Sequence, residues 1–438
     1  MNEDCIAEGT GLDNGYPRNI QLELTTRCNL HCRMCVKSAS DSCIAEEDLP
    51  LPVFRRLLPA LAHARKLILS GIGEPLLHPD LEEIIRLATA AMPPGAVIGF
   101  QTNGLLLDAG RALNLIEAGL STVCLSLDSL TAADAAWKGE HSVLDVERAT
   151  QHLQRARKER RAALRIGIET VITRENIGQL PDVIDWAVAR EIDYLIATHL
   201  ILYDRTSEAL DVFNPNTAAA MNLVQEYGRK AAEQDASLHD CLAAYRTFAK
   251  TASDYRAMKL LAAMQSDADA LGITLNVANL LARDQAEGQR IEAIISQAKQ
   301  AAAAGGLELL LPNQLALASR SCPFIEEEAV FIAASGNIVP CHFLRHACSY
   351  RVLGEVVQVR PRVFGNLHRQ SLEEVWRSEA YRSFRNEAGQ YGYAPCWNCS
   401  QGPCSSLVND RGDYANDCYG SQVPCGHCQW NLGGIRCL

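Results

Sequence analysis

The chain has no apolar run that approaches the length of a membrane span, and no charged and then apolar leader opens it. It also lacks an excess of basic residues, because 41 lysines and arginines face 52 aspartates and glutamates and give a formal net charge of −11. These absences argue against a membrane protein, a secreted protein and a nucleic-acid partner, whose phosphates demand basic patches. We therefore expect a cytoplasmic protein that binds neither membrane nor nucleic acid.

Cysteine, in contrast, is abundant, with 17 among 438 residues. In a chain without a leader, this high cysteine content predicts a reducing compartment, where the thiolates bind metals and do not form disulfides. Near the amino terminus, Cys28, Cys32 and Cys35 are separated by three residues and then two. Three thiolates leave one iron of a four-iron cluster without a protein ligand. Zinc, the alternative, prefers four ligands and a recurring two-residue gap, so this spacing favours iron–sulfur.

Short Val, Ile and Leu runs alternate with amphipathic stretches over residues 19–205, a pattern typical of βαβ units and a parallel sheet. The expected strands are residues 20–24, 67–70, 97–101, 122–127, 165–171 and 194–198. Polar residues at the ends of three of these runs, or in the turns that follow, include Glu74, Asn103 and Ser126. Active sites of open α/β sheets and barrels lie at such carboxyl ends of strands.

Together these features resemble the radical S-adenosylmethionine (SAM) superfamily. In that family the three cysteines hold a [4Fe–4S] cluster, and the amino and carboxylate groups of SAM chelate the fourth iron. One electron from the cluster cleaves the sulfonium bond, and the resulting 5′-deoxyadenosyl radical abstracts a substrate hydrogen. The resemblance implies an α/β fold, a partial (β/α)6 barrel, with Cys28, Cys32 and Cys35 as ligands of the SAM-site cluster.

The resemblance also implies which side chains contact SAM. Glu74, within Gly71-Ile72-Gly73-Glu74-Pro75, is expected to pair with the ammonium, and Ser126 to donate a hydrogen bond. Asn103 is either a SAM contact or only a turn former. Two positions depart from the family pattern. Met34 stands where the family commonly has an aromatic residue, and Lys138 stands where many members have an arginine. The expected SAM contacts are Met34, Gly71, Gly73, Glu74, Asn103, Ser126 and Lys138.

The composition changes after the barrel. Residues 206–315 are rich in alanine, glutamine and lysine and predict helices at 221–228, 242–264 and 291–304. A stretch of this length exceeds an ordinary connection, so we expect a helical insertion that caps the barrel mouth or docks a partner. Residues 1–18 form a short amino-terminal extension, and residues 316–438 form the last domain.

In the last domain the cysteines gather again, with a glycine five residues before Cys341, a Gly-Asn turn and two Cys-x-x-Cys pairs. This arrangement resembles a SPASM domain, which in radical SAM maturases carries auxiliary iron–sulfur clusters. A zinc ribbon is the alternative, but nine thiolates exceed the needs of one zinc ion. Two four-cysteine clusters leave one thiol over, and Cys348 is a further thiol nearby. The expected auxiliary ligands are Cys322, Cys341, Cys396, Cys399, Cys404, Cys418, Cys425, Cys428 and Cys437.

The tail, from residues 346–351 to the Gly-Ile-Arg-Cys end, resembles maturases of tungsten cofactor oxidoreductases. This resemblance implies a SAM-cleaving maturase that acts on a cofactor precursor, a peptide or a protein and takes electrons from a ferredoxin or flavodoxin. The alternatives are a maturase of ribosomally made peptides, a multi-cluster electron carrier without SAM chemistry, and a zinc-stabilised scaffold. No catalytic acid–base residue is identified from the sequence.

Overall fold

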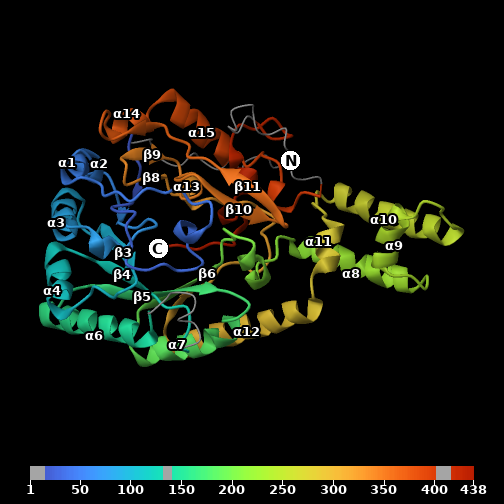
Figure 1. Ribbon diagram of the computed structural model, residues 1–438, viewed down its shortest axis with the longest axis horizontal. Helices are drawn as coiled ribbons and strands as arrows, with labels where there is room; N and C mark the ends of the chain where they lie inside the picture. Colours follow the sequence, from blue (N-terminus) through green and yellow to red (C-terminus); the bar gives the residue numbers. More distant parts are fainter. Residues whose placement is uncertain (1–14, 132–140, 401–415) are drawn as a thin grey trace, which may run out of the picture.

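The centre of the molecule is one sheet of ten strands, shown in Figure 1 with the helices around it. The computed structural model describes residues 15–131, 141–400 and 416–438. The strand order in the sheet is β12-β9-β8-β1-β2-β3-β4-β5-β6-β7, and β10 pairs with β11 separately. The strands are β1 Asn19–Leu22, β2 Lys66–Ile68, β3 Val97–Thr102, β4 Thr122–Ser126, β5 Arg165–Ile172, β6 Tyr194–His199, β7 Glu308–Leu310, β8 Ala329–Ile332, β9 Asn337–Val339, β10 Cys348–Val352, β11 Glu355–Val359 and β12 Gly365–Asn366.

Strands β1 to β6 pair in parallel in chain order, which confirms the six strands and the α/β class expected from the sequence. Alternate side chains of each strand point to opposite faces. On β1, Ile20 and Leu22 are fully buried in the main core, whereas Asn19 and Gln21 on the other face are half-buried. The apolar residues therefore pack under the helices, and the polar residues face the interior, where the site lies.

Helices cover the outer face of the parallel strands, because their apolar stripes bury against it. In α3, for example, Leu81, Ile84 and Ile85 are buried, while Glu82 and Glu83 are acidic residues of its first turn. The helices are α1 Leu51–Arg55, α2 Leu58–Leu61, α3 Leu81–Ala91, α4 Ala109–Ala118, α6 Val143–Arg160, α7 Leu180–Ala189, α8 Ala218–Ala232, α9 Leu238–Arg246, α10 Ala252–Ala270, α11 Val277–Ala282, α12 Gln285–Gly305, α13 Pro323–Glu326, α14 Leu372–Trp376 and α15 Glu379–Gly389.

The carboxyl-terminal third is built into the same sheet. Strand β8 pairs in parallel with β1, with Ile20 opposite Val330. Strand β9 then pairs antiparallel with β8, and β12 with β9. The sequence predicts an apolar strand here but not its partner. The cysteine-rich segments are thus carried directly beside the first strand of the barrel.

Helices α8 to α11 form a separate lobe that extends away from the sheet (Figure 1). They have their own buried cluster, which includes Tyr227, Cys241 and Met264. In this structure the lobe does not cap the barrel mouth. The single helix predicted at 242–264 is wrong, because the chain breaks between α9 and α10 where Thr251 and Asp254 form a capping box. Helix α12 leaves the lobe and packs on the barrel core through Ile291 and Ala298.

Among the described residues, no helix is long and apolar enough to cross a membrane.

Candidate active site

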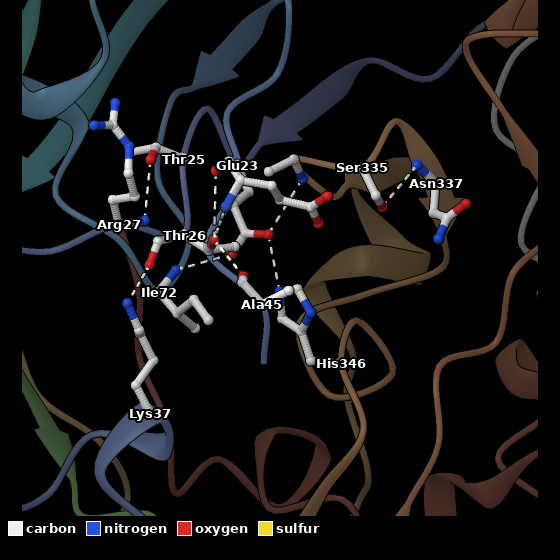
Figure 2. Close-up of polar contacts among 12 residues, drawn as sticks. Glu23, Thr25, Thr26, Arg27, Lys37, Ala45, Ile72, Ser335, Asn337 and His346 are labelled. Carbon is white, nitrogen blue, oxygen red and sulfur yellow. Dashed lines mark hydrogen bonds and ion pairs between the residues drawn. The ribbon is translucent and has the colours of Figure 1, made fainter. Parts of the chain in front are cut away.

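The three amino-terminal cysteines lie on one loop that leaves the carboxyl end of β1. The loop is fixed at its base, where Lys37 Nζ donates to the Thr26 carbonyl at 2.6 Å and the Thr26 hydroxyl donates to the Ala45 carbonyl at 2.7 Å (Figure 2). The thiols of Cys28, Cys32 and Cys35 are each half-buried. Such a loop places three thiols at the mouth of the barrel without burying them.

Burial and neighbouring charges shift the pKa of the Cys28 thiol. Burial raises the pKa of Cys28, and the charges of Glu74 and Cys35 raise it further, while that of Lys37 lowers it. Electrostatic coupling of this kind requires the groups to lie close together. The structure therefore brings the cysteine loop and the turn that contains Glu74 to one place, as the sequence predicts.

The turn at residues 71–75 approaches the cysteine loop more closely than any side chain permits. A Cβ added to Gly73 would lie 2.2 Å from the Thr25 carbonyl oxygen, and one added to Gly71 would lie 2.3 Å from Glu23 Cγ. The amide of Glu74 donates to the Arg27 carbonyl at 2.8 Å. Glycine is required at position 73 because the two backbones are in direct contact, and at position 71 because the side chain of Glu23 fills the space.

Glu74 braces this turn from inside. Its side chain is 2% exposed and accepts hydrogen bonds from the Thr102 hydroxyl at 2.6 Å and the amides of Asn103 and Leu76 at 2.8 and 3.1 Å. Burial nevertheless raises its pKa, because these bonds offset only part of the desolvation. The carboxylate thus joins the end of β3 to the turn.

Asn103 and Ser126 lie at the carboxyl ends of β3 and β4. The amide of the Asn103 side chain donates to Asn29 Oδ1 at 2.8 Å, which ties the turn after β3 to the cysteine loop. Its own oxygen accepts from the Leu105 amide at 3.0 Å, so Asn103 is also a turn former. Ser126 Oγ accepts from the Gln101 side chain at 3.4 Å and is half-buried.

Met34 rests on an apolar cluster at the end of β6, made of Leu200, Leu202 and Leu210. Its flexible thioether is therefore held against the barrel wall between the second and third cysteines of the loop. Lys138, the expected partner of the SAM carboxylate, lies outside the described residues.

The sequence gives no signal for Glu23, yet this residue connects four parts of the site (Figure 2). It is fully buried, and its carboxylate accepts from the amides of Ile72 at 3.0 Å and Ala334 at 3.3 Å and pairs with His346 Nε2 at 2.8 Å. Burial alone would raise the pKa of Glu23, but the hydrogen bond and charge of His346, with the charge of Arg345, hold it below its usual value. Glu23 thus links β1, the glycine turn, the end of β8 and the carboxyl-terminal domain.

Four carboxyl-terminal thiols form one group. Burial raises the pKa of Cys425 well above its usual value, and the charges of Cys428, Cys341 and Cys322 raise it further. The pKa of Cys428 is raised by burial and by Cys341 and Cys322 in the same way. Segments that are more than 80 residues apart in sequence therefore converge here. Binding a metal would replace protons on these thiols, because the thiolate is the ligand.

The structure describes four of the five remaining predicted ligands. Cys396 lies against Gly426, where an added Cβ would be 3.0 Å from the Cys396 sulfur, and the carbonyl of Cys399 accepts from Asn276 in the lobe at 3.4 Å. Cys418 is exposed, and Cys404 lies outside the described residues. The Cys437 sulfur lies 3.8 Å from His342 Nδ1.

Residues 433–438 run beside β6 into the space enclosed by the strands (Figure 1). The amide of His199 donates to the Gly434 carbonyl at 3.3 Å, and the amide of Arg436 donates to the Thr198 hydroxyl at 3.1 Å. Leu438 packs against Cys124 and its neighbours on the inner face of the sheet. The end of the tail therefore fills part of the barrel interior.

The donor set fits iron–sulfur chemistry, because it consists of thiols in one group of three and one group of four. Within the described part of the chain, no three His, Cys, Asp or Glu side chains lie close enough to hold a single metal ion. A four-iron cluster spans more space than one ion and suits ligands that are set farther apart.

A small cavity of about 30 Å³ lies between the cysteine loop and the carboxyl-terminal domain. Its lining includes Val36 next to Cys35, Tyr203 after β6, and the segment from His342 to Tyr350. The cavity is therefore lined by residues that are next in sequence to cysteines of both groups, Val36 beside Cys35 and His342 beside Cys341.

Comparison with known proteins identifies the class. Residues 22–187 match the radical SAM superfamily, and residues 322–400 match the SPASM iron–sulfur cluster-binding domain. In its fold the chain is similar to SuiB of Streptococcus suis, with a TM-score of 0.52 at 11% identity, over 93% of this chain and 77% of that one. The chain belongs to the radical SAM superfamily and carries a SPASM domain, and it is a radical SAM enzyme of the maturase type.

Over nearly its whole length the chain is similar to the tungsten-containing aldehyde ferredoxin oxidoreductase cofactor-modifying protein of Pyrococcus furiosus. The two are 24% identical over 429 residues, which cover 95% of this chain and 96% of the relative. A PqqA peptide cyclase of Rhodopseudomonas palustris is 32% identical over 196 residues, only 43% of this chain and 48% of the relative.

Proposed function

We propose that Cys28, Cys32 and Cys35 hold a [4Fe–4S] cluster whose remaining iron binds SAM. The observation that carries this proposal is the contact between the cysteine loop and the glycine turn, fixed by the bond from the Glu74 amide to the Arg27 carbonyl. When bound, the cluster and SAM together supply a 5′-deoxyadenosyl radical. The SAM contacts that we propose are those expected from the sequence, Met34, Gly71, Gly73, Glu74, Asn103, Ser126 and Lys138.

The protein's own residues orient these groups. Asn103 holds the cysteine loop against the turn after β3, and Glu74 keeps the glycine turn in place from below. The backbone carbonyls of that turn are then available to the SAM ammonium. Met34 offers an apolar surface to the adenine. The chain thus contributes position and electrostatics, and no protein base is needed for hydrogen abstraction.

We further propose two auxiliary iron–sulfur clusters. The mutual influence of Cys322, Cys341, Cys425 and Cys428 supports these four as the ligands of one cluster. This leaves Cys437, beside His342, as the surplus thiol. The remaining candidates for the second cluster are Cys396, Cys399, Cys404 and Cys418.

The substrate that we propose is a precursor of the cofactor of a tungsten-containing oxidoreductase. The similarity to the cofactor-modifying protein supports this, because it spans the barrel, the lobe and the cysteine-rich domain. A ferredoxin or flavodoxin would deliver the electrons, and the cytoplasm is the reducing compartment that free thiols need.

Modification of a peptide or protein is the second candidate. It is favoured by the similarity to a PqqA peptide cyclase, which is limited to less than half of either chain. The two candidates share the SAM site and differ in the substrate that loses the hydrogen.

The test is anaerobic reconstitution of the protein, followed by dithionite and SAM. We expect release of 5′-deoxyadenosine, and we expect Cys32→Ala to abolish it because the cluster loses a ligand. Cys43→Ala is the matched control, since Cys43 is an exposed cysteine outside the triplet. Unchanged release from Cys32→Ala would contradict the role of the triplet, and no release from the wild-type protein would favour an electron carrier or a zinc scaffold.

A further inference from the structure

The carboxyl-terminal tail, residues 433–438, carries a thiol into the barrel. The tail is anchored at its start, where the Asn313 amide donates to the Gly433 carbonyl at 2.7 Å. Gly433 turns the chain with a φ of +76°, a conformation that favours glycine. The tail then follows β6, and the carboxyl terminus lies within the space that the strands enclose (Figure 1). Leu438 packs on inward-facing residues of β4 and β6, which places Cys437 inside the barrel.

The Cys437 thiol lies beside an imidazole of defined tautomer. Its sulfur is 3.8 Å from His342 Nδ1. The side-chain carbonyl oxygen of Gln21 contacts His342 Nε2, and because that oxygen can only accept, Nε2 carries the proton. Nδ1 therefore presents its lone pair to the thiol, which donates to it. Trp430 lies close enough to the same sulfur to shift its pKa, and its ring is 6.0 Å from the His342 ring.

The thiol keeps its hydrogen at neutral pH and is accessible. Burial raises the pKa of Cys437 to about 12, and the charge of Glu169 raises it further, while those of Arg345 and Lys66 lower it. Glu169 lies on β5 and Lys66 on β2, so the thiol lies between walls of the barrel that are not neighbours in the sheet. The side chain of Cys437 is nevertheless exposed, which shows that it faces open space within the barrel.

This space adjoins the proposed SAM site. Burial raises the pKa of Tyr203, and the charges of Cys35 and Cys437 are both among those that raise it further. Tyr203 is therefore within electrostatic reach of the first cluster and of the tail. Glu169, whose charge acts on Cys437, is the register partner of Ser126, a proposed SAM contact. The tail thus brings an exchangeable hydrogen to the place where the radical chemistry would occur.

We propose that Cys437 is the hydrogen donor of this active site and returns a hydrogen atom from its thiol to the carbon radical left on the substrate. This inference rests on the proposed function and adds a catalytic residue to it. It also accounts for the one carboxyl-terminal thiol that the proposed clusters leave over.

The step is balanced as follows. The S–H bond of Cys437 breaks, a C–H bond forms on the substrate, and an unpaired electron is left on the sulfur. The transfer is favourable because an S–H bond is weaker than an ordinary C–H bond. One electron from the ferredoxin or flavodoxin proposed above and one proton from water restore the thiol. The substrate keeps its number of hydrogens, so its net change is a rearrangement or an inversion at carbon.

The first test uses the anaerobically reconstituted holoenzyme in D₂O with dithionite and SAM, without a substrate. The Cys437 thiol exchanges its hydrogen for deuterium and donates it directly to the 5′ carbon, and dithionite then reduces the sulfur. Mass spectrometry should show one solvent deuterium in most of the 5′-deoxyadenosine from the wild-type protein. Cys437→Ala and Cys437→Ser should each lower the deuterated fraction at least fivefold. Serine keeps the size of the side chain, but its O–H bond is too strong to donate.

The second test involves no turnover. The unreduced holoenzyme is treated with methyl methanethiosulfonate, a small thiol reagent, and modification of Cys437 is followed by peptide mass spectrometry. SAM should slow this modification at least fivefold, because the bound nucleoside closes the route to the thiol. Cys43 is the internal control, since it is exposed and outside the triplet, and SAM should leave its modification unchanged. In D₂O, Cys43→Ala should keep the deuterated fraction of the wild type.

A deuterated fraction that survives in both Cys437 variants would overturn the proposal, and so would modification of Cys437 that SAM does not slow. Iron content and circular dichroism of each variant establish that it folds, and loss of iron from Cys437→Ser would overturn the proposal by making the thiol a cluster ligand. If the wild-type protein releases 5′-deoxyadenosine without solvent deuterium, only the hydrogen donor fails. If it releases none, the proposed function is overturned.

Discussion

At the scale of single residues, Glu23 has the most consequential environment in the site. Its carboxylate is fully buried and is shared by two backbone amides and His346. A buried charge of this kind is tolerated only when it is paired and hydrogen-bonded, so each partner becomes a fixed point of the structure. Three chain segments that are distant in sequence are held in register by one side chain.

We predict that Glu23→Gln destabilises the protein at pH 7 by about 1–3 kcal/mol, because a charge-assisted contact is lost without a change in size. The pKa of Glu23 is held below its ordinary 4.5 in the folded protein, so its stabilising contribution is complete above that pH and is lost as the pH falls through the folded value. The difference between variant and wild type should therefore begin to shrink below about pH 4.5 and disappear only below the lower pKa of the folded protein. Thermal unfolding followed by circular dichroism between pH 7 and pH 3.5 checks this.

The exposed pair of Glu83 with Arg86 supplies the control. Glu83→Gln should shift stability by no more than about 0.5 kcal/mol, since surface ion pairs contribute little. A Glu23→Gln protein that is as stable as wild type at pH 7 would contradict the assignment.

At the scale of elements, the lobe of α8 to α11 is a unit with its own core. Met264 is fully buried within it, between helices that bury no residue in the main core. The lobe is joined to the cysteine-rich domain at its base, where Asn398 donates to Asn216 Oδ1 at 2.8 Å. The free energy of unfolding of the lobe should therefore be separable from that of the barrel.

We predict that Met264→Ala lowers the stability of the lobe by about 2–5 kcal/mol through the cavity that it leaves. Amide hydrogen exchange followed by mass spectrometry should speed up in α8 to α10 and stay unchanged in the barrel strands. Lys259→Ala, an exposed change on the same helix, should alter neither. Equal acceleration across the barrel strands would show that the lobe is not an independent unit.

Local patterns explain why much of the fold was predictable. Short apolar runs identify the strands from β1 to β6. A few consecutive residues are enough to identify the cysteine loop and the glycine turn. The break between α9 and α10 also has a local signal, the capping-box spacing of Thr251 and Asp254, but the prediction of one helix over residues 242–264 overlooked it. In these cases the physical cause lies within one turn of chain.

The pairing of β8 with β1 had no such signal. A parallel pair places two buried strands side by side and leaves no local pattern in either sequence. Glu23 likewise has no local sequence signal that distinguishes it from an ordinary polar residue. The cavity could not be predicted either, because its walls come from distant residues such as Val36, Tyr203 and Trp430. Sites assembled from distant segments become visible only in three dimensions.

At the scale of the whole molecule, the proposed clusters give a defined metal content. The complete protein should hold about twelve irons, four for each of three clusters. We predict that Cys425→Ala lowers this by about four irons, because it removes a ligand from the group of four thiols. Cys437→Ala should keep all of them. Iron analysis with visible absorption checks both, and loss of iron from Cys437→Ala would move that cysteine into a cluster.

The parallel pair of β1 and β8 also constrains how the protein is made. Asn19 emerges from the ribosome some 310 residues before its neighbour Ala329. At 5–20 residues per second, the open edge of β1 waits roughly 15–60 s for that neighbour. An unpaired edge strand invites contacts with other chains, so nascent protein is exposed to aggregation for this interval. Slow translation and chaperones that shield hydrophobic edges should thus govern the yield of active material.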